Sequence, residues 1–99
     1  MLEIRIGEKG VIVLSGRFDA SQAVQAERFM AGLAESRVLD LANLVYISSL
    51  GLGVLLETQK RLMASGHSLK LVNVRGYVRE IFNYSGFERI FEIEPAPPT

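Results

Sequence analysis

Residues 38–56 read VLDLANLVYISSLGLGVLL, and this stretch decides the fold. It opens with a short apolar run, Val38–Leu41, which contains one acid, Asp40, and stops at a polar break, Ala42–Asn43. An apolar run of this kind predicts a buried β-strand. From Ser49 onward the leucines recur at helical spacing, which predicts an α-helix that begins with a capping serine. The stretch therefore predicts a strand, a loop with two hydroxyls and a helix N-terminus, where a phosphate is well accommodated.

The residues before this stretch predict a β-hairpin followed by a helix. Leu2–Ile6 alternates apolar and charged residues and Val11–Leu14 is continuously apolar, so we expect two strands joined by the turn Gly7–Gly10. Apolar residues at helical spacing predict a helix over Gln22–Glu35. The next strand is expected at Arg37–Leu41, and a strand, a helix and a strand of these lengths predict a right-handed parallel crossover.

The residues after the loop predict a second helix, running from Ser49 to about Ser65, and three further elements. Glu57 and Arg61 are spaced to form an ion pair on the exposed face of this helix. The further elements are a strand, a short helix and a last strand, expected at Leu69–Val74, Tyr77–Ser85 and Ile90–Ile93. The predicted fold is a single α/β domain over residues 1–94, with a mixed, mostly parallel sheet and about three to four helices. A proline-rich tail is expected at residues 95–99.

Composition excludes several classes of function. The chain has 99 residues, a formal net charge of zero and no cysteine, and its eleven lysines and arginines are scattered. Scattered positive charge argues against a nucleic-acid partner, and the absence of cysteine excludes disulfides and thiolate metal sites. No apolar run approaches the roughly 20 residues that span a bilayer, so no membrane insertion is expected. We expect a cytoplasmic domain.

The segment DLANLVYISSLGLGVLL, at residues 40–56, resembles the signature of the STAS domain, the module of anti-sigma factor antagonists and of sulfate-transporter tails. GRFDA at residues 16–20 is similar to the segment that follows the second strand of that family. YSGFERIFEI at residues 84–93 is similar to the family's closing helix, turn and strand. The resemblance therefore covers nearly the whole chain, and it implies the STAS fold.

The resemblance also implies a phosphorylation switch. In the family, a partner kinase phosphorylates the second residue of the small polar pair, which aligns with Ser49. This implies an anti-sigma factor antagonist that binds an anti-sigma factor, a serine kinase of the ATPase fold, and thereby frees a sigma factor. Phosphorylation of Ser49 ends the binding, and a phosphatase is expected to reverse it. The chain needs no cofactor, because the nucleotide belongs to the partner.

Two alternatives stay open at this loop. The residues alone explain Ser49 as a helix cap, a role compatible with phosphorylation, and Ser48 is a rival acceptor that could simply hydrogen-bond within the loop. Ser48 and Leu50 also depart from the best-studied antagonists, which carry Asp and then Ser or Thr at these positions. The departures leave room for a second function, a constitutive STAS subunit of a transport or signalling assembly.

Other polar and small residues complete the candidate site. Asp40 is expected at the end of its strand, where it would accept hydrogen bonds from the serine loop. Asp19 is either a helix cap, a role that Ser21 could also take, or, as the resemblance implies, part of what the kinase recognises. Gly51 and Gly53 weaken the helix, which suits either a close approach by a partner or tight packing. The candidate surface comprises Arg17, Asp19, Asn43, Ser48, Ser49, Leu50, Gly51, Gly53 and Glu57.

An enzymatic function is not expected. A serine nucleophile needs a base, and the only histidine, His67, lies beyond the far end of the second helix. A helix over Ser49–Ser65 is roughly 25 Å long, so the two residues cannot meet. One histidine without cysteine cannot make a zinc site unless several carboxylates contribute, and Gly51-Leu52-Gly53 lacks the spacing of a phosphate-binding loop.

Overall fold

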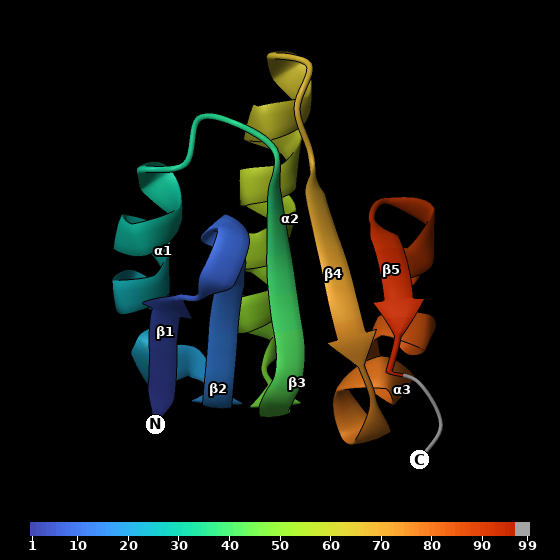
Figure 1. Cartoon of the computed structure of the whole chain (residues 1–99). Helices are drawn as coiled ribbons and strands as arrows, with labels where there is room; N and C mark the ends of the chain where they lie inside the picture. Colours follow the sequence, from blue (N-terminus) through green and yellow to red (C-terminus); the bar gives the residue numbers. More distant parts are fainter. Residues whose placement is uncertain (97–99) are drawn as a thin grey trace.

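The computed structural model describes residues 1–96, which form one five-stranded sheet and three α-helices (Figure 1). The strands lie across the sheet in their sequence order, β1-β2-β3-β4-β5. β1 is antiparallel to β2, and each later strand is parallel to the one before it. The strands are β1 (Leu2–Ile6), β2 (Ile12–Phe18), β3 (Arg37–Ile47), β4 (Leu69–Val74) and β5 (Glu92–Pro95), and the helices are α1 (Ala23–Ala31), α2 (Ser49–Ala64) and α3 (Gly76–Ser85). The predicted mixed, mostly parallel α/β fold is confirmed.

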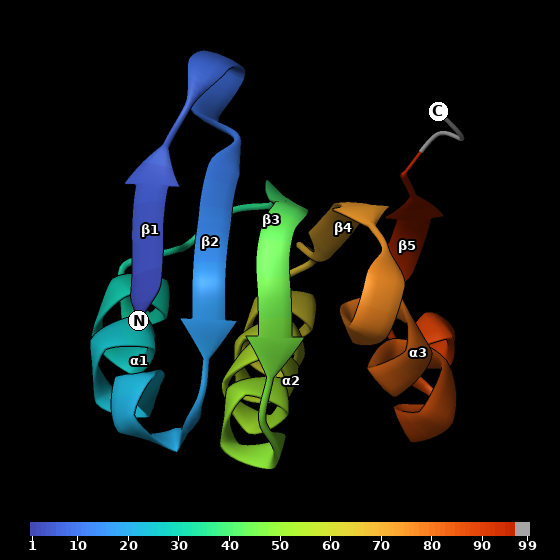
Figure 2. The same ribbon diagram turned by 90° about the horizontal axis from the view of Figure 1, so that it is seen from below.

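The three α-helices lie on the same side of the sheet (Figure 2). Strand residues that alternate in the sequence, such as Leu39 and Leu41, point toward the helices and are completely buried. They belong to one apolar cluster with Leu55 of α2 and Phe82 of α3. Since a right-handed crossover returns each helix to the same face of the sheet, the topology places α2 directly behind the strands that lead into and out of it.

β3 is longer than predicted, because the polar break at Ala42–Asn43 does not end it. In its pairing with β2, β3 contains one extra residue after Asp40 and another after Leu44. Each bulge shifts the side chains that follow by one position, so the buried residues near the end of the strand are Leu44 and Ile47, three apart. The interruption of the apolar pattern marks these bulges, and the strand continues to the serine loop.

The end of α1 is held by a residue of α2. Arg61 donates hydrogen bonds of 2.7 Å to the carbonyl oxygens of Met30 and Leu33. These carbonyls lie where α1 ends at Ala31, several residues earlier than predicted, and a guanidinium suits the negative end of a helix. The predicted ion pair between Glu57 and Arg61 is wrong, because neither residue forms a salt bridge within residues 1–96.

A buried glutamine joins α2 to the start of β4 and to the segment before β5. Gln59 is only 2% exposed. Its side-chain oxygen accepts a 2.7 Å hydrogen bond from the backbone N–H of Leu69, the first residue of β4. Its side-chain nitrogen donates at 3.0 Å to the carbonyl oxygen of Ile90, which precedes β5. One amide therefore satisfies two backbone groups from different segments.

The C-terminal strand lies slightly later than predicted. β5 begins at Glu92, and the predicted Ile90 and Phe91 instead follow a short 3-10 turn, Phe87–Arg89. Pro95 belongs to β5, and the N–H of Ala96 donates to the carbonyl oxygen of Val74 at 3.1 Å. The rest of the predicted tail, residues 97–99, lies outside the described residues.

Candidate functional site

The site lies where β2 and β3 end side by side. Phe18, the last residue of β2, pairs with Ile47, the last residue of β3. The backbone N–H of Ser48 then donates to the carbonyl oxygen of Phe18 at 2.9 Å. Because parallel strands end at the same edge of a sheet, Asp19 and the serine loop share this edge.

The two serines have different local roles. Ser48 is the N-cap of α2: its backbone is extended, and its hydroxyl oxygen accepts a 3.2 Å hydrogen bond from the N–H of Gly51. The sequence-based assignment of this cap to Ser49 is therefore wrong by one residue. Ser49 is the first residue of α2, its side chain is exposed, and its hydroxyl makes no hydrogen bond within residues 1–96. The hydroxyl of Ser49 is thus free to react or to be bound.

The exposed candidate residues extend from this loop in two directions. Leu50 is 55% exposed and lies next to Ser49, and Glu57 continues the outer side of α2 about 12 Å further along. Arg17 and Asp19 lie on the other side of the loop, at the end of β2. Asn43 does not join them, because it lies within β3, where it pairs with Ser15.

The two glycines in the first turns of α2, Gly51 and Gly53, differ. A Cβ atom on Gly51 would lie 2.8 Å from a side-chain carbon of Ile47 and 3.0 Å from the carbonyl oxygen of Phe18. Gly51 is buried, so it serves tight packing and does not belong to the surface. A Cβ atom on Gly53 would meet nothing within 4 Å. Nothing described within the chain therefore requires a glycine at position 53.

We expect alanine substitutions to separate the two glycines. Gly53→Ala should raise the free energy of unfolding by about 1 kcal/mol, because alanine favours the helix and meets no neighbour. Gly51→Ala should lower it by about 1–2 kcal/mol, because overpacking against Phe18 and Ile47 outweighs the same helical gain. Urea unfolding of both variants measures the difference, and equal stability of the two would contradict this explanation.

Asp40 lies away from the site. Its carboxylate accepts hydrogen bonds from the backbone N–H of Ala42 at 3.0 Å and from the side-chain amide of Asn73 at 3.1 Å. Asn73 has a left-handed backbone, φ 58°, at an irregularity in β4. The prediction that Asp40 ends its strand and holds the serine loop is wrong, since β3 continues to Ile47.

Asp19 is a cap with a carboxylate at the site. Its oxygen accepts hydrogen bonds from the backbone N–H of Ser21 at 3.1 Å and from the hydroxyl of Ser21 at 2.6 Å, which caps the 3-10 turn Ala20–Gln22 ahead of α1. The hydrogen bond from the Ser21 hydroxyl is the main reason that the pKa of Asp19 lies below its ordinary value. Asp19 therefore adds a negative charge to the sheet edge that also carries the positive charge of Arg17.

Two tyrosines at the site are not among the predicted residues. The guanidinium of Arg17 lies 4.3 Å from the ring centre of Tyr46, and the ring of Tyr77 on α3 stacks on Tyr46 with centres 6.0 Å apart. Such a stack holds Arg17 along the sheet edge. Tyr46, two positions before the serine pair, was visible in the sequence. Its stacking partner, Tyr77, comes from a separate element 31 positions further on, so the pair itself could not be predicted from the sequence.

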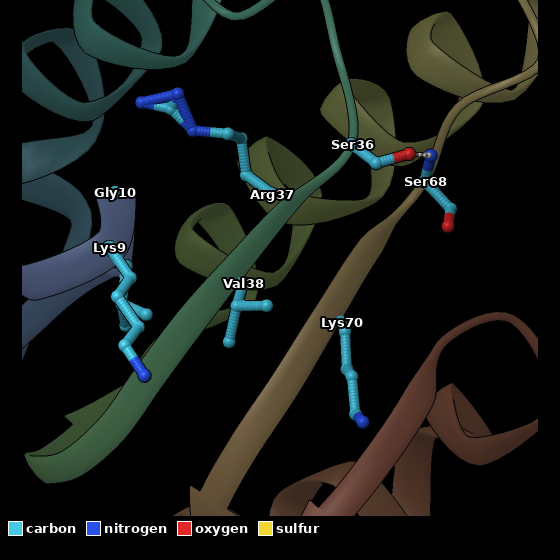
Figure 3. A pocket seen from close by; sticks show the side chains of 8 residues that line it. Lys9, Gly10, Ser36, Arg37, Val38, Ser68 and Lys70 are labelled. Carbon is cyan, nitrogen blue, oxygen red and sulfur yellow. Dashed lines mark hydrogen bonds between the residues drawn. The ribbon is translucent and has the colours of Figure 1, made fainter.

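A hollow lies at the opposite end of the sheet from the serine loop (Figure 3). It is lined by Lys9, Arg37, Val38 and Lys70, among others, and occupies about 350 Å³. Lys70 forms salt bridges with Glu92 and Glu94 on β5, which raise the pKa of its ammonium group through hydrogen bonds, first to Glu94. The hollow is near the start of β3, whereas the serine loop follows its end.

Among residues 1–96, the only histidine lies far from the hydroxyl of Ser49. His67 lies at the opposite end of α2, where its Nδ1 is 3.4 Å from the hydroxyl of Ser36. Within residues 1–96, no group of three histidine, cysteine, aspartate or glutamate side chains could hold a metal ion. In the same part of the chain, no helix has the length and apolar character required to cross a membrane. The arrangement suits an acceptor that another protein modifies.

Comparison with known proteins finds relatives over most of the chain. The family model described as "Mlab, STAS domain" matches residues 4–93. A candidate anti-sigma factor antagonist of Bordetella bronchiseptica, BtrV, is 37% identical over 87 residues, which cover 84% of this chain and 75% of that protein.

Solved structures show the same fold. An anti-sigma factor antagonist from Mycobacterium paratuberculosis superposes with a TM-score of 0.77 at 24% identity, covering 96% of this chain and 85% of the other. The unphosphorylated anti-sigma factor antagonist SpoIIAA gives 0.72 at 18% identity, covering 94% and 87%. SpoIIAA of Bacillus is also known in a phosphorylated form, which gives 0.68 at 18% identity and covers 94% and 90%.

Proposed function

The chain belongs to the STAS domain family, and from this premise we propose that it is an anti-sigma factor antagonist switched by phosphorylation of Ser49. In this proposal it is a binding module of the cytoplasm and has no catalytic activity of its own. The unphosphorylated form binds a kinase-type anti-sigma factor through the serine edge and so frees a sigma factor. The kinase then transfers phosphate from its ATP to Ser49, and a phosphatase restores the binding form.

One observation supports this choice above all. The adjacent serines divide two tasks, since Ser48 caps α2 and leaves the hydroxyl of Ser49 exposed and free of hydrogen bonds within residues 1–96. A serine that the fold needs for capping would be held against its helix. Ser49 has no such role, and the exposed Leu50 beside it offers apolar contact to a partner.

The helix N-terminus explains why phosphate is tolerated here. The first amides of an α-helix lack intrahelical partners, and the positive end of the helix dipole stabilises a phosphate on its first residue. Asp19 gives the kinase a charged feature at the same edge. A phosphate on Ser49 adds negative charge and bulk at the edge where the partner makes contact, which weakens binding.

We expect Ser49→Ala to abolish labelling by the cognate kinase, while Ser48→Ala stays labelled. Ser48→Ala should also lower the free energy of unfolding by about 1 kcal/mol, because the variant loses the helix cap. The kinase can be recovered by pull-down from a lysate of the source organism and assayed with radiolabelled ATP, with phosphopeptide mapping of the product.

Persistent labelling of Ser49→Ala would overturn the assignment of the acceptor. If the wild-type chain, Ser49→Ala and Ser49→Asp all recover the same partners from the lysate, and Ser49 is never modified, the chain is a constitutive subunit of a larger assembly.

A further inference from the structure

A groove between α1 and α2 begins beside the proposed phosphorylation site. It occupies about 490 Å³, with Leu50 next to Ser49 at one end and Arg61 at the other. Leu50 and Arg61 both belong to α2 and lie 11 positions apart, so the groove is roughly 16 Å long, enough for about three turns of a helix.

The floor of the groove is apolar. Met30 of α1 and Val54 of α2 line it and are almost completely buried. Thr58 also lines it, but its hydroxyl donates at 2.7 Å to the carbonyl oxygen of Val54 in its own helix. This hydrogen bond satisfies the hydroxyl within α2, so Thr58 adds no free donor to the floor of the groove.

The rim of the groove is acidic. Glu27 of α1 and Glu57 of α2 are exposed on opposite sides, and neither forms a salt bridge within residues 1–96. Arg61 closes the far end, but its donors are directed at the carbonyl oxygens of Met30 and Leu33. An apolar floor between two unpaired carboxylates is complementary to apolar side chains flanked by cations.

Gly53 forms part of the wall of this groove. It weakens α2, yet a Cβ atom at this position would meet nothing within 4 Å. The missing side chain therefore widens the groove and exposes the helix backbone, which lets another helix approach closely. The groove thus has a shape, a charge and a glycine that internal packing does not explain.

We propose that this groove binds a basic amphipathic helix of the partner protein. Its apolar side chains pack on Leu50, Gly53 and Val54, and its arginines or lysines pair with Glu27 and Glu57. The inference rests on the proposed function, because it takes the occupant to be part of the kinase that phosphorylates Ser49. It adds the chemistry of the partner's contact, which the phosphorylation switch alone does not specify.

The test uses two peptides of about 15 residues, long enough to form isolated helices. The basic peptide carries leucines on one face flanked by arginines, and the acidic peptide has glutamates in place of the arginines. Amide chemical shifts of the ¹⁵N-labelled chain are followed during titration. We expect the basic peptide to shift the amides of Leu50, Gly53, Val54 and Thr58, and the acidic peptide to leave them unchanged.

Variants then separate the groove from general surface effects. Gly53→Leu should weaken binding of the basic peptide at least about tenfold, whereas Ala64→Leu, about three turns further along the same side of α2, should not. The double variant Glu27→Lys/Glu57→Lys should bind the acidic peptide in preference to the basic one, and Glu3→Lys on β1 is its control. Both glutamates are exposed, so this arm remains informative even if Gly53→Leu fails to fold.

Equal binding of the two peptides, shifts centred outside the groove, or unchanged preference in the double variant would each overturn the inference. Self-association of the chain that Gly53→Leu abolishes would also overturn it, because the occupant would then be a second copy. If the groove variants bind the kinase as the wild type does and Ser49 is still labelled, the groove inference fails and the switch stands. If the basic peptide occupies the groove but Ser49 is never labelled, the groove chemistry stands and the switch fails.

Discussion

Replacing Gln59 with methionine is expected to lower the free energy of unfolding by about 3 kcal/mol. Methionine fills a similar volume but cannot replace either hydrogen bond of the amide. The buried N–H of Leu69 and the partly buried carbonyl oxygen of Ile90 would both lose their partner. The midpoint of urea unfolding, measured with an unchanged slope, reports the loss.

Gln25→Met is the matched control. Gln25 is exposed on α1, and its side chain reaches the carbonyl oxygen of Leu2 only at 3.5 Å. Its replacement should change stability by less than about 0.5 kcal/mol. If Gln59→Met were as small in effect as this control, the two hydrogen bonds would not be what holds the start of β4 near the residues that precede β5.

A glutamate at position 59 should make the same effect depend on pH. Protonated, its carboxyl can accept from Leu69 and donate to Ile90, as the amide does. Ionised, it loses the donor and places a charge in a buried site, so burial should raise its pKa in the folded state above that of the unfolded chain. Relative to the wild type, Gln59→Glu should therefore be most stable in acid and lose stability as the pH rises through the raised pKa.

Ser49→Asp is expected to bind the partner kinase about a hundredfold more weakly than the wild type, a loss of about 3 kcal/mol. The added carboxylate places charge and bulk on the serine edge, where the partner is proposed to make contact. Its effect on folding should be opposite in sign. An acid at the first position of α2 is stabilised by the helix dipole, so the free energy of unfolding should rise by roughly 0.5 kcal/mol.

If Ser49→Asp folds at least as stably as the wild type yet binds the kinase far more weakly, the loss of binding cannot be attributed to unfolding. Calorimetric titration of the kinase, alongside thermal unfolding of the same samples, measures both quantities. Wild-type chain phosphorylated by the kinase and then treated with a phosphatase serves as the control, because its affinity should return. Undiminished affinity of both Ser49→Asp and the phosphorylated chain would contradict the switch.

Local patterns in the sequence were enough to predict the strands, the helices and a mixed, mostly parallel sheet. The alternation in Leu2–Ile6, the apolar run at Val11–Leu14 and the helical spacing after Ser49 each correspond to an element of the structure. The extent of β3 could not be predicted, because bulges disturb the alternation on which strand predictions depend. Two adjacent serines also look alike as caps, and only the backbone decides that Ser48 takes this role.

Contacts between distant residues explain what else the sequence left undetermined. Asp40 is held by Asn73 of β4, and no local pattern selects that partner over the neighbouring loop. In the sequence, Gln59 is indistinguishable from an ordinary exposed polar residue of a helix. Its burial is decided by β4 and by the segment before β5, which lie far from it in the sequence. The stack of Arg17, Tyr46 and Tyr77 likewise combines residues of β2, β3 and α3.

The strand order has a consequence for how the chain is made. Because neighbours in the sheet are also neighbours in the sequence, no strand has to insert between two that have already paired. As the ribosome releases the chain, β2 can pair with β1, and each later strand can then pair with the exposed edge of the strand before it. Each closure brings together segments separated by only one helix or turn, which keeps the entropy lost per step small. Synthesis from the N-terminus therefore follows the order in which the sheet can be built.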